Sequence, residues 1–560
     1  MTSAGPAVLN PSVWNTELTP LSFLRRCADV YPDKVAVVHG EQRLTYRELA
    51  QRVEQLADAL RAAGVQPGDR VAYLMPNVPD MIVAHFGVPL AEAVLVAINT
   101  RLSSGEVQYI LDHSESVVLV VDSALIPAVE PVADALATVH TMIVSRDEHG
   151  APGDPGGLPD AVDLATFLAA GYSDDADRAA PRWAVDDERA TISINYTSGT
   201  TGRPKGVMYT HRGAYLNALG EIYHSAHSPD SVYLWTLPMF HCNGWCTPWA
   251  LVAAGGTQVC LREVRGDRIW ELIGEHGVTH LNGAPTVLTT ITSAEQARSL
   301  EHQIVVTTAG APPSPTTIGR MERLGFRIVH VYGLTETYGP YSVCQWQSSW
   351  ADLDPRERAV LQARQGVGMV QAERLRVIHT GEEFDLSDEL VDVPADGQVL
   401  GEIVMRGNNV MKGYFRDPEA TEAAFRGGWF HSGDLGVMHP DGYVELRDRA
   451  KDVVISGGEN ISTVEVEHAL ASHDAVLEVA VIGVPDEKWG ERPKAFVVLA
   501  PGQQVEPEAL LDHVRSHLAR YKAPREVEFV SELPKTATGK IQKFALRDKE
   551  WSGHEKRIRG

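Results

Sequence analysis

Cysteine, cationic side chains and long apolar runs are all scarce in this sequence. Five cysteines in 560 residues are too few for a disulfide framework, and a chain of this length buries enough core to need none. Lysine and arginine number 50 against 74 aspartate and glutamate residues, and this net charge of −24 disfavours binding to a nucleic-acid backbone. The longest apolar stretches, 86–99 and 117–126, are interrupted by Glu92 and Asp122, so no transmembrane span is expected.

The N-terminus lacks the features of an export signal. Residues 1–20 contain no basic segment followed by an apolar stretch. Together with the low cysteine content, this predicts a reduced, cytoplasmic protein. Apolar residues make up 44% and charged residues 22%, as in ordinary globular proteins, and at about 150 residues per domain the length predicts three to four compact units.

Short β-branched segments alternate with segments of helical periodicity near the start of the chain. Strands are expected at 34–39, 70–74, 93–98 and 117–121, and helices at 46–63, 79–90 and 104–113. Gly64 is expected to end the first of these helices. Repeated strand–helix–strand units predict parallel sheet with helices on both faces. A Gly-, Pro- and Asp-rich stretch, 146–189, is predicted to be a solvated loop with one short helix inside it.

The pattern changes near residue 440. A hairpin strand at 442–446 is followed by a charged, hinge-like segment, RDRAKD, at 447–452. Beyond it, strands at 476–482 and 495–500 and a helix at 508–520 are enough for a small α+β domain. The sequence therefore predicts an α/β protein: a large N-terminal domain, 1–447, of stacked parallel and mixed sheets with flanking helices, and a small C-terminal domain, 448–560.

The strongest functional signal is the segment 196–206, YTSGTTGRPKG, directly after an apolar strand. Its glycines permit the positive φ angles of a tight loop, and its hydroxyls, backbone amides and single ammonium group together suit a phosphate. The spacing differs from a Walker A loop. The phosphate-binding candidates are Thr197, Ser198, Gly199, Thr200, Thr201, Gly202 and Lys205.

With this loop the chain resembles the adenylate-forming superfamily, which includes acyl-CoA synthetases, peptide-synthetase adenylation domains and beetle luciferases. Four more segments match signatures of that superfamily in its order: 332–337 (YGLTET), 429–435 (WFHSGDL), 448–459 (DRAKDVVISGGE) and 534–540 (PKTATGK). The resemblance covers roughly residues 20–547. It implies that a carboxylic acid reacts with ATP to give an acyl-adenylate and pyrophosphate, and that the acyl group then passes to a thiol.

The resemblance implies a nucleotide-binding role for several matched residues. Glu336 would help to hold Mg²⁺ and Thr335, in the same turn as Gly333, would reach the α-phosphate. Asp434 would bind the ribose hydroxyls, and Arg449 the ribose or the phosphates. The residues expected against adenine are Gly310, Ala311, Pro312 and Tyr332. Each of these three residues also has a structural explanation: Glu336 as an acid favoured at a helix start, Asp434, taken alone, as an aspartate in a turn, and Tyr332 as a buried core tyrosine.

Catalysis is assigned by the resemblance to Lys540. Its ammonium group would bridge the substrate carboxylate and the α-phosphate as negative charge develops. Lys451 matches a hinge about which the mobile C-terminal domain would move between the half-reactions. After that motion Gly457, Gly458 and Glu459 would face the adenylate, where backbone can approach a thin pantetheine arm closely.

The segment 239–249, MFHCNGWCTPW, is predicted to surround the acid. His241 resembles the superfamily's histidine near the acyl carboxylate, Trp245 and Trp249 suggest a crowded apolar wall, and Gly310 is assigned to the same subsite. No acidic residue at 238–248 could pair an α-ammonium group, which argues against amino-acid substrates. The segment is most similar to a branch that contains methylmercaptopropionate–CoA ligases and short- to medium-chain synthetases, although a bulky aryl or polycyclic acid fits equally well.

The leading prediction is an ATP- and Mg²⁺-dependent acyl-CoA synthetase with coenzyme A as acceptor. Transfer to a separate carrier protein, a non-catalytic nucleotide- or acyl-binding homologue, and luciferase-like oxygenation are the alternatives. A zinc site at His241, Cys242 and Cys246 is disfavoured because no second Cys/His pair lies at metal spacing. The sequence leaves the acid and the oligomeric state open, and a homodimer is compatible with it.

Overall fold

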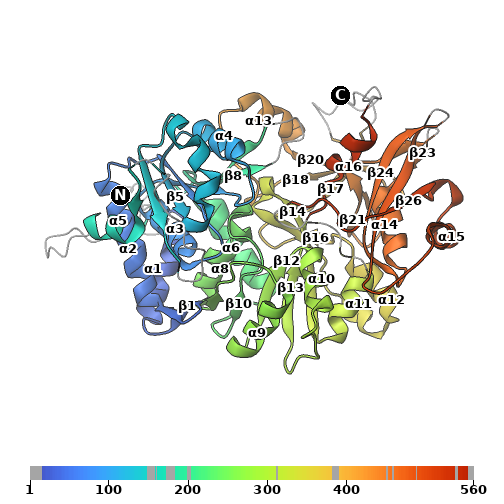
Figure 1. The fold of residues 1–560 in the computed structure, drawn as a ribbon, viewed down its shortest axis with the longest axis horizontal. Helices are drawn as coiled ribbons and strands as arrows, with labels where there is room; N and C mark the ends of the chain where they lie inside the picture. The colour runs from blue at the N-terminus through green and yellow to red at the C-terminus, as the bar shows by residue number, and fades with distance from the viewer. Residues whose placement is uncertain are drawn as a thin grey trace, which may run out of the picture.

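A computed structural model describes residues 15–147, 158, 160–171, 183–197, 203–310, 313, 315–380, 390–449, 452–456, 459–486, 489–536 and 540–552. Within these residues the strands form four sheets. Three lie in the larger N-terminal part and one in the C-terminal part, at opposite ends of the long axis (Figure 1).

The first helices and strands build an eight-stranded sheet. Its order is β19-β9-β8-β4-β3-β5-β6-β7, and β3 to β6 and β8 run parallel. The strands are β3 Arg70–Leu74, β4 Val94–Ile98, β5 Ser116–Asp122, β6 Thr141–Ser145, β7 Val162–Asp163, β8 Thr191–Thr197, β9 Lys205–Thr210 and β19 Gly413–Tyr414. The accompanying helices are α1 Leu21–Val30, α2 Tyr46–Ala62, α3 Pro79–Leu90, α4 Ser104–Ser114 and α5 Leu164–Gly171. The predicted alternation is therefore confirmed, and Gly64, with φ +89°, follows α2 as expected.

A nine-stranded sheet lies beside it. Its order is β16-β15-β14-β13-β12-β10-β11-β1-β2; β14 to β1 in this order run parallel, and β2, β15 and β16 pair antiparallel at the two edges. The strands are β1 Val35–His39, β2 Gln42–Thr45, β10 Val232–Leu234, β11 Thr257–Val259, β12 His280–Gly283, β13 Ile304–Thr308, β14 Phe326–Leu334, β15 Gly339–Val343 and β16 Val367–Gly368. The helices are α6 His211–Ser225, α7 Cys242–Trp245, α8 Thr247–Ala254, α9 Gly266–His276, α10 Pro285–Ser293, α11 Pro315–Arg323 and α12 Pro355–Gln362.

Helix α3 is the centre of the main core. All of its residues except Asp80 are buried, and it packs with α2 and α8 in the largest cluster of apolar side chains. A helix that is apolar around its whole circumference must be covered on every side. This explains why its sequence shows little of the amphipathic pattern expected of a surface helix.

The C-terminal part is smaller and has its own core. A four-stranded antiparallel sheet, with β17 Arg376–Ile378, β18 Gly401–Met405, β20 Phe430–Met438 and β21 Val444–Arg449, precedes it, together with α13 Pro418–Ala424. The last sheet contains β22 Val454–Ser456, β23 Glu459–Ile461, β24 Val476–Asp486, β25 Gly490–Leu499 and β26 Glu526–Phe529, with helices α14 Thr463–Ala471, α15 Pro507–His517 and α16 Lys543–Glu550. The predicted α/β class, with a large N-terminal part of mixed sheets and a smaller α+β part, is confirmed.

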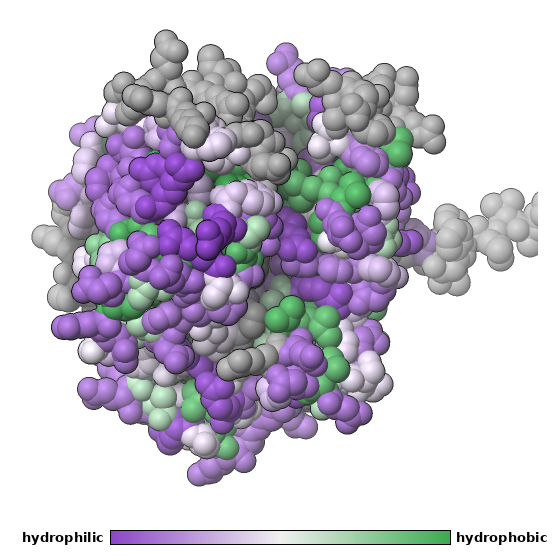
Figure 2. Space-filling model, turned by 90° about the vertical axis from the view of Figure 1, so that its right-hand side faces the viewer, coloured by the Kyte–Doolittle hydropathy of each residue, from purple (hydrophilic) through white to green (hydrophobic). Residues whose placement is uncertain are grey.

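The surface of this C-terminal end is largely hydrophilic, with small separate apolar patches (Figure 2). None of the described helices is both long and apolar enough to cross a bilayer. The chain leaves the four-stranded sheet at Arg449 and enters the last sheet at Val454, while the exact domain boundary at 447/448 stays a prediction.

Candidate active site

The described ends of the predicted phosphate loop meet in the eight-stranded sheet. β8 ends at Thr197 and β9 begins at Lys205, and these two residues face each other in the antiparallel ladder. The candidates between them, Ser198, Gly199, Thr200, Thr201 and Gly202, lie outside the described residues. The two strands therefore bring the loop's first hydroxyl and its cation together.

Lys205 lies close to the carboxylate predicted to hold the metal. Its Nζ is 4.8 Å from the centroid of the Tyr414 ring and 4.0 Å from Asp417 Oδ2. The Tyr414 hydroxyl donates a hydrogen bond of 2.9 Å to Glu336 Oε1. Burial and the Glu336 carboxylate raise the pKa of Tyr414, so the phenol remains a donor. One tyrosine thus contacts both the cation, through its ring, and the carboxylate, through its hydroxyl.

Sequence reasoning missed Tyr414 and Asp417. Tyr414 reaches the site because β19 pairs with β9, and this long-range pairing leaves no local signature. Asp417 does have a signal, since an aspartate before Pro418 predicts a helix N-cap, and its side chain accepts from the Ala420 amide at 3.0 Å. That signal explains its position but gives no indication of the neighbouring Lys205.

Two of the predicted nucleotide residues are in contact. The Tyr332 hydroxyl donates to Asp434 Oδ2 at 2.8 Å, and the two residues are 8% and 3% exposed. Asp434 also faces Arg449 in the β20–β21 ladder, although the Arg449 side chain is outside the described part of the chain. Tyr332 therefore fixes the orientation of a buried carboxylate, a contact that neither motif predicts by itself.

The turn after β14 is tightly constrained. A Cβ on Gly333 would lie 1.9 Å from the Gly339 carbonyl oxygen, so only glycine fits there. The Thr335 carbonyl accepts from the Tyr209 hydroxyl at 2.6 Å, and the Oγ1 of Thr335 lies 3.5 Å from Cys242 Sγ. The turn that carries Thr335 and Glu336 is therefore held in place from both of the larger sheets.

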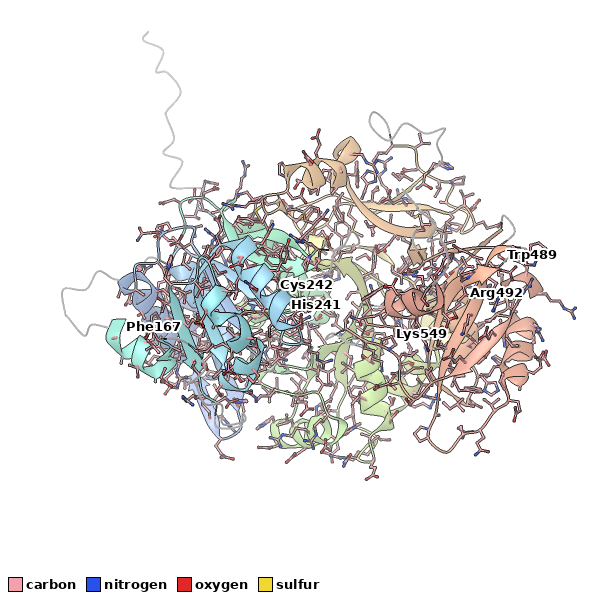
Figure 3. All side chains as sticks on the ribbon, turned by 45° about the horizontal axis from the view of Figure 1, so that its top comes forward. Phe167, His241, Cys242, Trp489, Arg492 and Lys549 are labelled. Carbon is pink, nitrogen blue, oxygen red and sulfur yellow. The ribbon has the colours of Figure 1, made fainter. Side chains whose placement is uncertain are left out.

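His241 and Lys540, the two predicted catalytic residues, lie within electrostatic range of each other. Burial and, to a smaller extent, the Lys540 ammonium group together lower the pKa of His241 to about 4. At neutral pH the imidazole is therefore uncharged. His241 lies near the middle of the long axis of the molecule, between Phe167 at one end and Trp489 at the other (Figure 3). Lys540, from the C-terminal part, is thus close enough for its charge to act on His241.

The segment after His241 has an unusual backbone. Cys242, Asn243, Gly244, Trp245 and Cys246 have φ angles of 47°, 42°, 55°, 58° and 64°, so α7 is one turn of left-handed helix. For L-residues this conformation costs about 1–2 kcal/mol per residue and is rare outside single positions. Surrounding contacts must therefore impose it.

Asn243 supplies most of those contacts. It is fully buried, and its Oδ1 accepts from the Ser193 hydroxyl at 2.8 Å and from the Asn195 amide. Its backbone NH donates to Asn195 Oδ1 at 3.1 Å. Because Ser193 and Asn195 are on β8, the turn is joined to the strand that leads into the predicted phosphate loop. The sequence alone predicted no functional role for Ser193 or Asn195.

Trp245 projects from this turn into a small apolar cluster. It is 4% exposed, and a Cβ on Gly339 would lie 2.7 Å from its ring. The cluster contains Leu237, Cys242, Trp245, Val305, Ala309, Val329, Val331, Val343 and Met369. Trp249, predicted to line the same wall, belongs instead to the main core, where its Nε1 donates to the His85 carbonyl at 3.0 Å.

The remaining candidates are only partly described. Gly310 has φ +92°, and the nearest atom to a Cβ there would be the Ala284 Cβ at 4.0 Å, so its surface is open. Glu459 is on β23, but its side chain is not described. Ala311, Pro312, Lys451, Gly457 and Gly458 lie outside the described residues. Burial raises the pKa of Cys242 to about 12, so this thiol is protonated and unreactive.

Comparisons with known proteins agree over nearly the whole chain. A family model for AMP-binding enzyme matches residues 24–415, and one for the AMP-binding enzyme C-terminal domain matches 465–540. Acetate–CoA ligase CCL3 of Humulus lupulus is 44% identical over 549 residues, and acetate/butyrate–CoA ligase AAE7 of Arabidopsis thaliana is 45% identical over 554; both alignments cover 95% of each chain. A crystal structure of the anthranilate CoA ligase AuaEII with anthranoyl-AMP is 25% identical, with a TM-score of 0.82 over 97% of this chain and 99% of that one.

These relatives overturn the expectation of a cytoplasmic protein. AAE7 and three further relatives are named peroxisomal. The inference was wrong because the absence of an export signal carries no information about this compartment, whose address is a short receptor-bound sequence rather than an apolar leader.

The predicted family, by contrast, is confirmed. The family models match most of the chain, and the relatives that span it are CoA ligases. The chain belongs to the AMP-binding enzyme family of the adenylate-forming superfamily and is an AMP-forming acyl-CoA ligase.

Proposed function

We propose that this ligase activates a short aliphatic carboxylic acid, of about two to five carbons given a site closed by one indole ring. The observation that carries the proposal is Trp245. It follows His241 on the left-handed turn and is buried against Gly339, and in this proposal it would limit the depth available beyond the imidazole. The surrounding cluster is apolar, in keeping with an uncharged acyl chain. The names of CCL3 and AAE7, acetate and acetate/butyrate ligases, support the same size class.

Adenylation requires two anions to approach each other. Lys540 is proposed to bridge the acid carboxylate and the α-phosphate, with the neutral imidazole of His241 orienting the carboxylate through a hydrogen bond. Lys205 and the hydroxyls of Thr197 and its loop would hold the leaving phosphates. Asp434, oriented by Tyr332, would accept hydrogen bonds from the ribose, with Arg449 beside it.

Glu336 fits the requirement for Mg²⁺. Magnesium is usually bound by one or two carboxylates together with phosphate oxygens and water, and Glu336 offers a partly buried carboxylate next to the Lys205 loop. A bound Mg²⁺ would neutralise charge on the phosphates during the displacement. The Tyr414 hydroxyl would keep the carboxylate in position.

The second half-reaction is proposed to use coenzyme A as acceptor. Gly457, Gly458 and Glu459 would face the adenylate once the C-terminal part beyond the hinge has moved about Lys451. This motion would withdraw Lys540 from the site, where its charge is no longer needed after pyrophosphate has left.

A panel of acids tests the proposal. Pyrophosphate release with coenzyme A present should be highest for acetate, propanoate, butanoate and branched four- and five-carbon acids, and should fall for octanoate and benzoate. Thioester formation should accompany it. A preference for octanoate or an aryl acid would contradict the assignment to short acids, and adenylate formation without a CoA thioester would favour a carrier protein as acceptor.

A further inference from the structure

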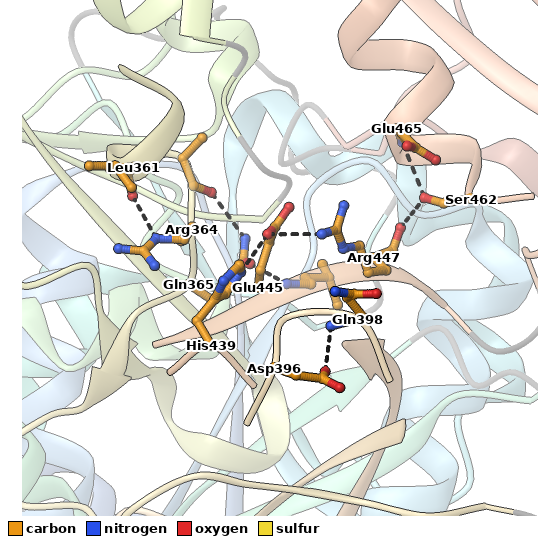
Figure 4. A network of polar contacts seen from close by, with 12 residues as sticks. Leu361, Arg364, Gln365, Asp396, Gln398, His439, Glu445, Arg447, Ser462 and Glu465 are labelled. Carbon is orange, nitrogen blue, oxygen red and sulfur yellow. Dashed lines mark hydrogen bonds and ion pairs between the residues drawn. The ribbon is translucent and has the colours of Figure 1, made fainter. Parts of the chain in front are cut away.

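A buried polar cluster joins β21 to the C-terminal part. Asp448, on β21, is 2% exposed, and its Oδ2 accepts from the backbone amide of Thr463 at 2.6 Å and from the Thr463 hydroxyl at 2.8 Å. The hydroxyl of Ser462 donates to the Arg447 carbonyl, and the Arg447 guanidinium pairs with Glu445 at 3.2 Å (Figure 4). Two successive residues of β21 thus hold the first turn of α14. Asp448 also places negative charge at the helix N-terminus, where it is favoured.

Lys543 completes the cluster from the other side. Its Nζ donates to the Thr463 hydroxyl at 2.6 Å and lies 2.8 Å from Glu467 Oε1. Burial lowers the pKa of Lys543, but the carboxylates of Glu467, Asp448 and Asp452 outweigh this effect and raise the pKa above its ordinary value. The Thr463 hydroxyl therefore donates to Asp448 and accepts from a charged lysine, so both of its polar functions are used across the junction.

This cluster is directly connected to the catalytic lysine. Lys543 is the first residue of α16 and lies three residues after Lys540. The Lys540 amide donates to Thr536 Oγ1 at 3.0 Å, and the Thr536 amide donates to the Lys540 carbonyl at 2.7 Å, so the backbone of Lys540 is held to Thr536. Only two residues, Ile541 and Gln542, therefore separate Lys543 of the cluster from Lys540, whose charge lowers the pKa of His241.

The two sides of the cluster belong to different sheets. Asp448 is on a strand of the four-stranded sheet, whereas Thr463 and Lys543 are on helices packed on the last sheet. The contact is thus made between the two parts of the chain, in the same relative orientation in which the charge of Lys540 acts on His241.

We propose that Thr463 and Lys543 are positioning residues for adenylation. Their contact with Asp448 holds the C-terminal part in the orientation that delivers Lys540 to the acid and ATP. The inference rests on the proposed role of Lys540. It assigns to the cluster a function that differs from stabilising the C-terminal part, because thioester formation from a ready-made acyl-adenylate does not need Lys540.

The test separates the two half-reactions. Thr463→Val, Asp448→Asn and Lys543→Met are compared with the unaltered enzyme in acid-dependent ATP–pyrophosphate exchange, and in CoA thioester formation from supplied butyryl-adenylate. A displacement of about 1 Å can cost about 100-fold, so Thr463→Val is expected to reduce exchange at least about tenfold. Thioester formation should stay within about twofold, because the groups it uses are not altered. Thr463→Val and Asp448→Asn decide the question if Lys543→Met does not fold.

Lys494→Met is the matched control. Lys494 is 6% exposed and pairs with Glu526, Glu528 and Glu550 at 2.9, 2.8 and 3.0 Å, all within the C-terminal part. Its loss removes a buried ammonium group from the same part of the chain without touching β21. The ratio of the two half-reactions should therefore remain that of the unaltered enzyme, whatever the change in thermal stability.

Two results would overturn the proposal. One is an equal loss of both half-reactions in Thr463→Val and Asp448→Asn, and the other is a shift of their ratio in Lys494→Met as large as in those variants. Lys540→Met distinguishes the two levels of inference. If that variant keeps pyrophosphate exchange, the proposed role of Lys540 is wrong and the positioning role falls with it; if it loses exchange while the cluster variants keep it, only the positioning role is wrong.

Discussion

Replacing Asn243 with alanine should destabilise the protein by about 3–7 kcal/mol. The substitution leaves the Ser193 hydroxyl and the Asn195 amide without their buried acceptor, at about 1–3 kcal/mol each. Alanine also tolerates a φ of 42° less well than asparagine does, which adds about 1 kcal/mol. Since whole proteins are stable by only about 5–15 kcal/mol, the variant should show a large decrease in its urea midpoint.

Glycine at the same position separates the two causes. Asn243→Gly loses the same hydrogen bonds but has no Cβ to strain in the left-handed conformation, so it should be about 1–2 kcal/mol more stable than Asn243→Ala. In a double-mutant cycle, the double variant Ser193→Ala/Asn243→Ala should lose less stability than the two single variants lose in sum, because the two residues share one hydrogen bond.

Urea denaturation followed by tryptophan fluorescence measures these differences, and kcat/KM for the preferred acid reports the effect on the site. The fluorescence is sensitive to this region because Trp245 is on the turn itself. The reasoning is refuted if Asn243→Ala is within about 1 kcal/mol of the unaltered protein, or if Asn243→Gly is no more stable than Asn243→Ala.

Three further predictions concern catalysis, specificity and pH. Lys540→Met should lower pyrophosphate exchange about 10²–10³-fold, as for the loss of one transition-state donor, while Lys494→Met should not; equal activities would argue against a catalytic lysine. Trp245→Ala should raise kcat/KM for hexanoate relative to acetate at least about tenfold, since one methylene in an apolar pocket is worth about 1–3 kcal/mol; an unchanged ratio would show that Trp245 does not limit the site. Burial raises the pKa of Glu221 to about 7, so the folded state keeps this proton up to that pH, whereas the unfolded state loses it near the ordinary pKa of 4.5. Stability should fall by up to about 3 kcal/mol as pH rises from about 4.5 to 7, and Glu221→Gln should remove that fall in denaturation measured at both pH values.

Much of the fold follows from local sequence patterns. The strands and helices expected between 34 and 121 agree with the structure to within one residue at their ends. These elements are predictable because side-chain periodicity and end signals such as Gly64 are properties of neighbouring residues. The order of strands in the two large sheets is not predictable in this way, since β1 pairs with β11 across more than 200 residues of chain.

The site divides in the same way. Each motif is recognisable alone, but the contacts between motifs depend on how the sheets are placed: Tyr332 with Asp434, Tyr414 with Glu336, and Asp448 with Thr463. No spacing in the sequence predicts these pairs, because each joins elements of different sheets or of the two parts of the chain. Lys205 is an example: the sequence predicts its role as a cation of the phosphate loop, but it does not predict the Tyr414 ring beside it.

The left-handed turn shows why sequence reasoning fails most completely next to the acid site. Cys242, Trp245 and Cys246 have no preference for positive φ, and only Asn243 and Gly244 adopt it readily. Local preference therefore opposes the observed backbone, and the hydrogen bonds from β8 together with the packing of Trp245 must outweigh it. A segment whose conformation is imposed from outside can hold His241 and Trp245 at a fixed separation without depending on its own sequence to fold. The same hydrogen bonds join this turn to β8, the strand that leads into the phosphate loop. A substitution in β8 should therefore alter the binding of the acid as well as that of the nucleotide.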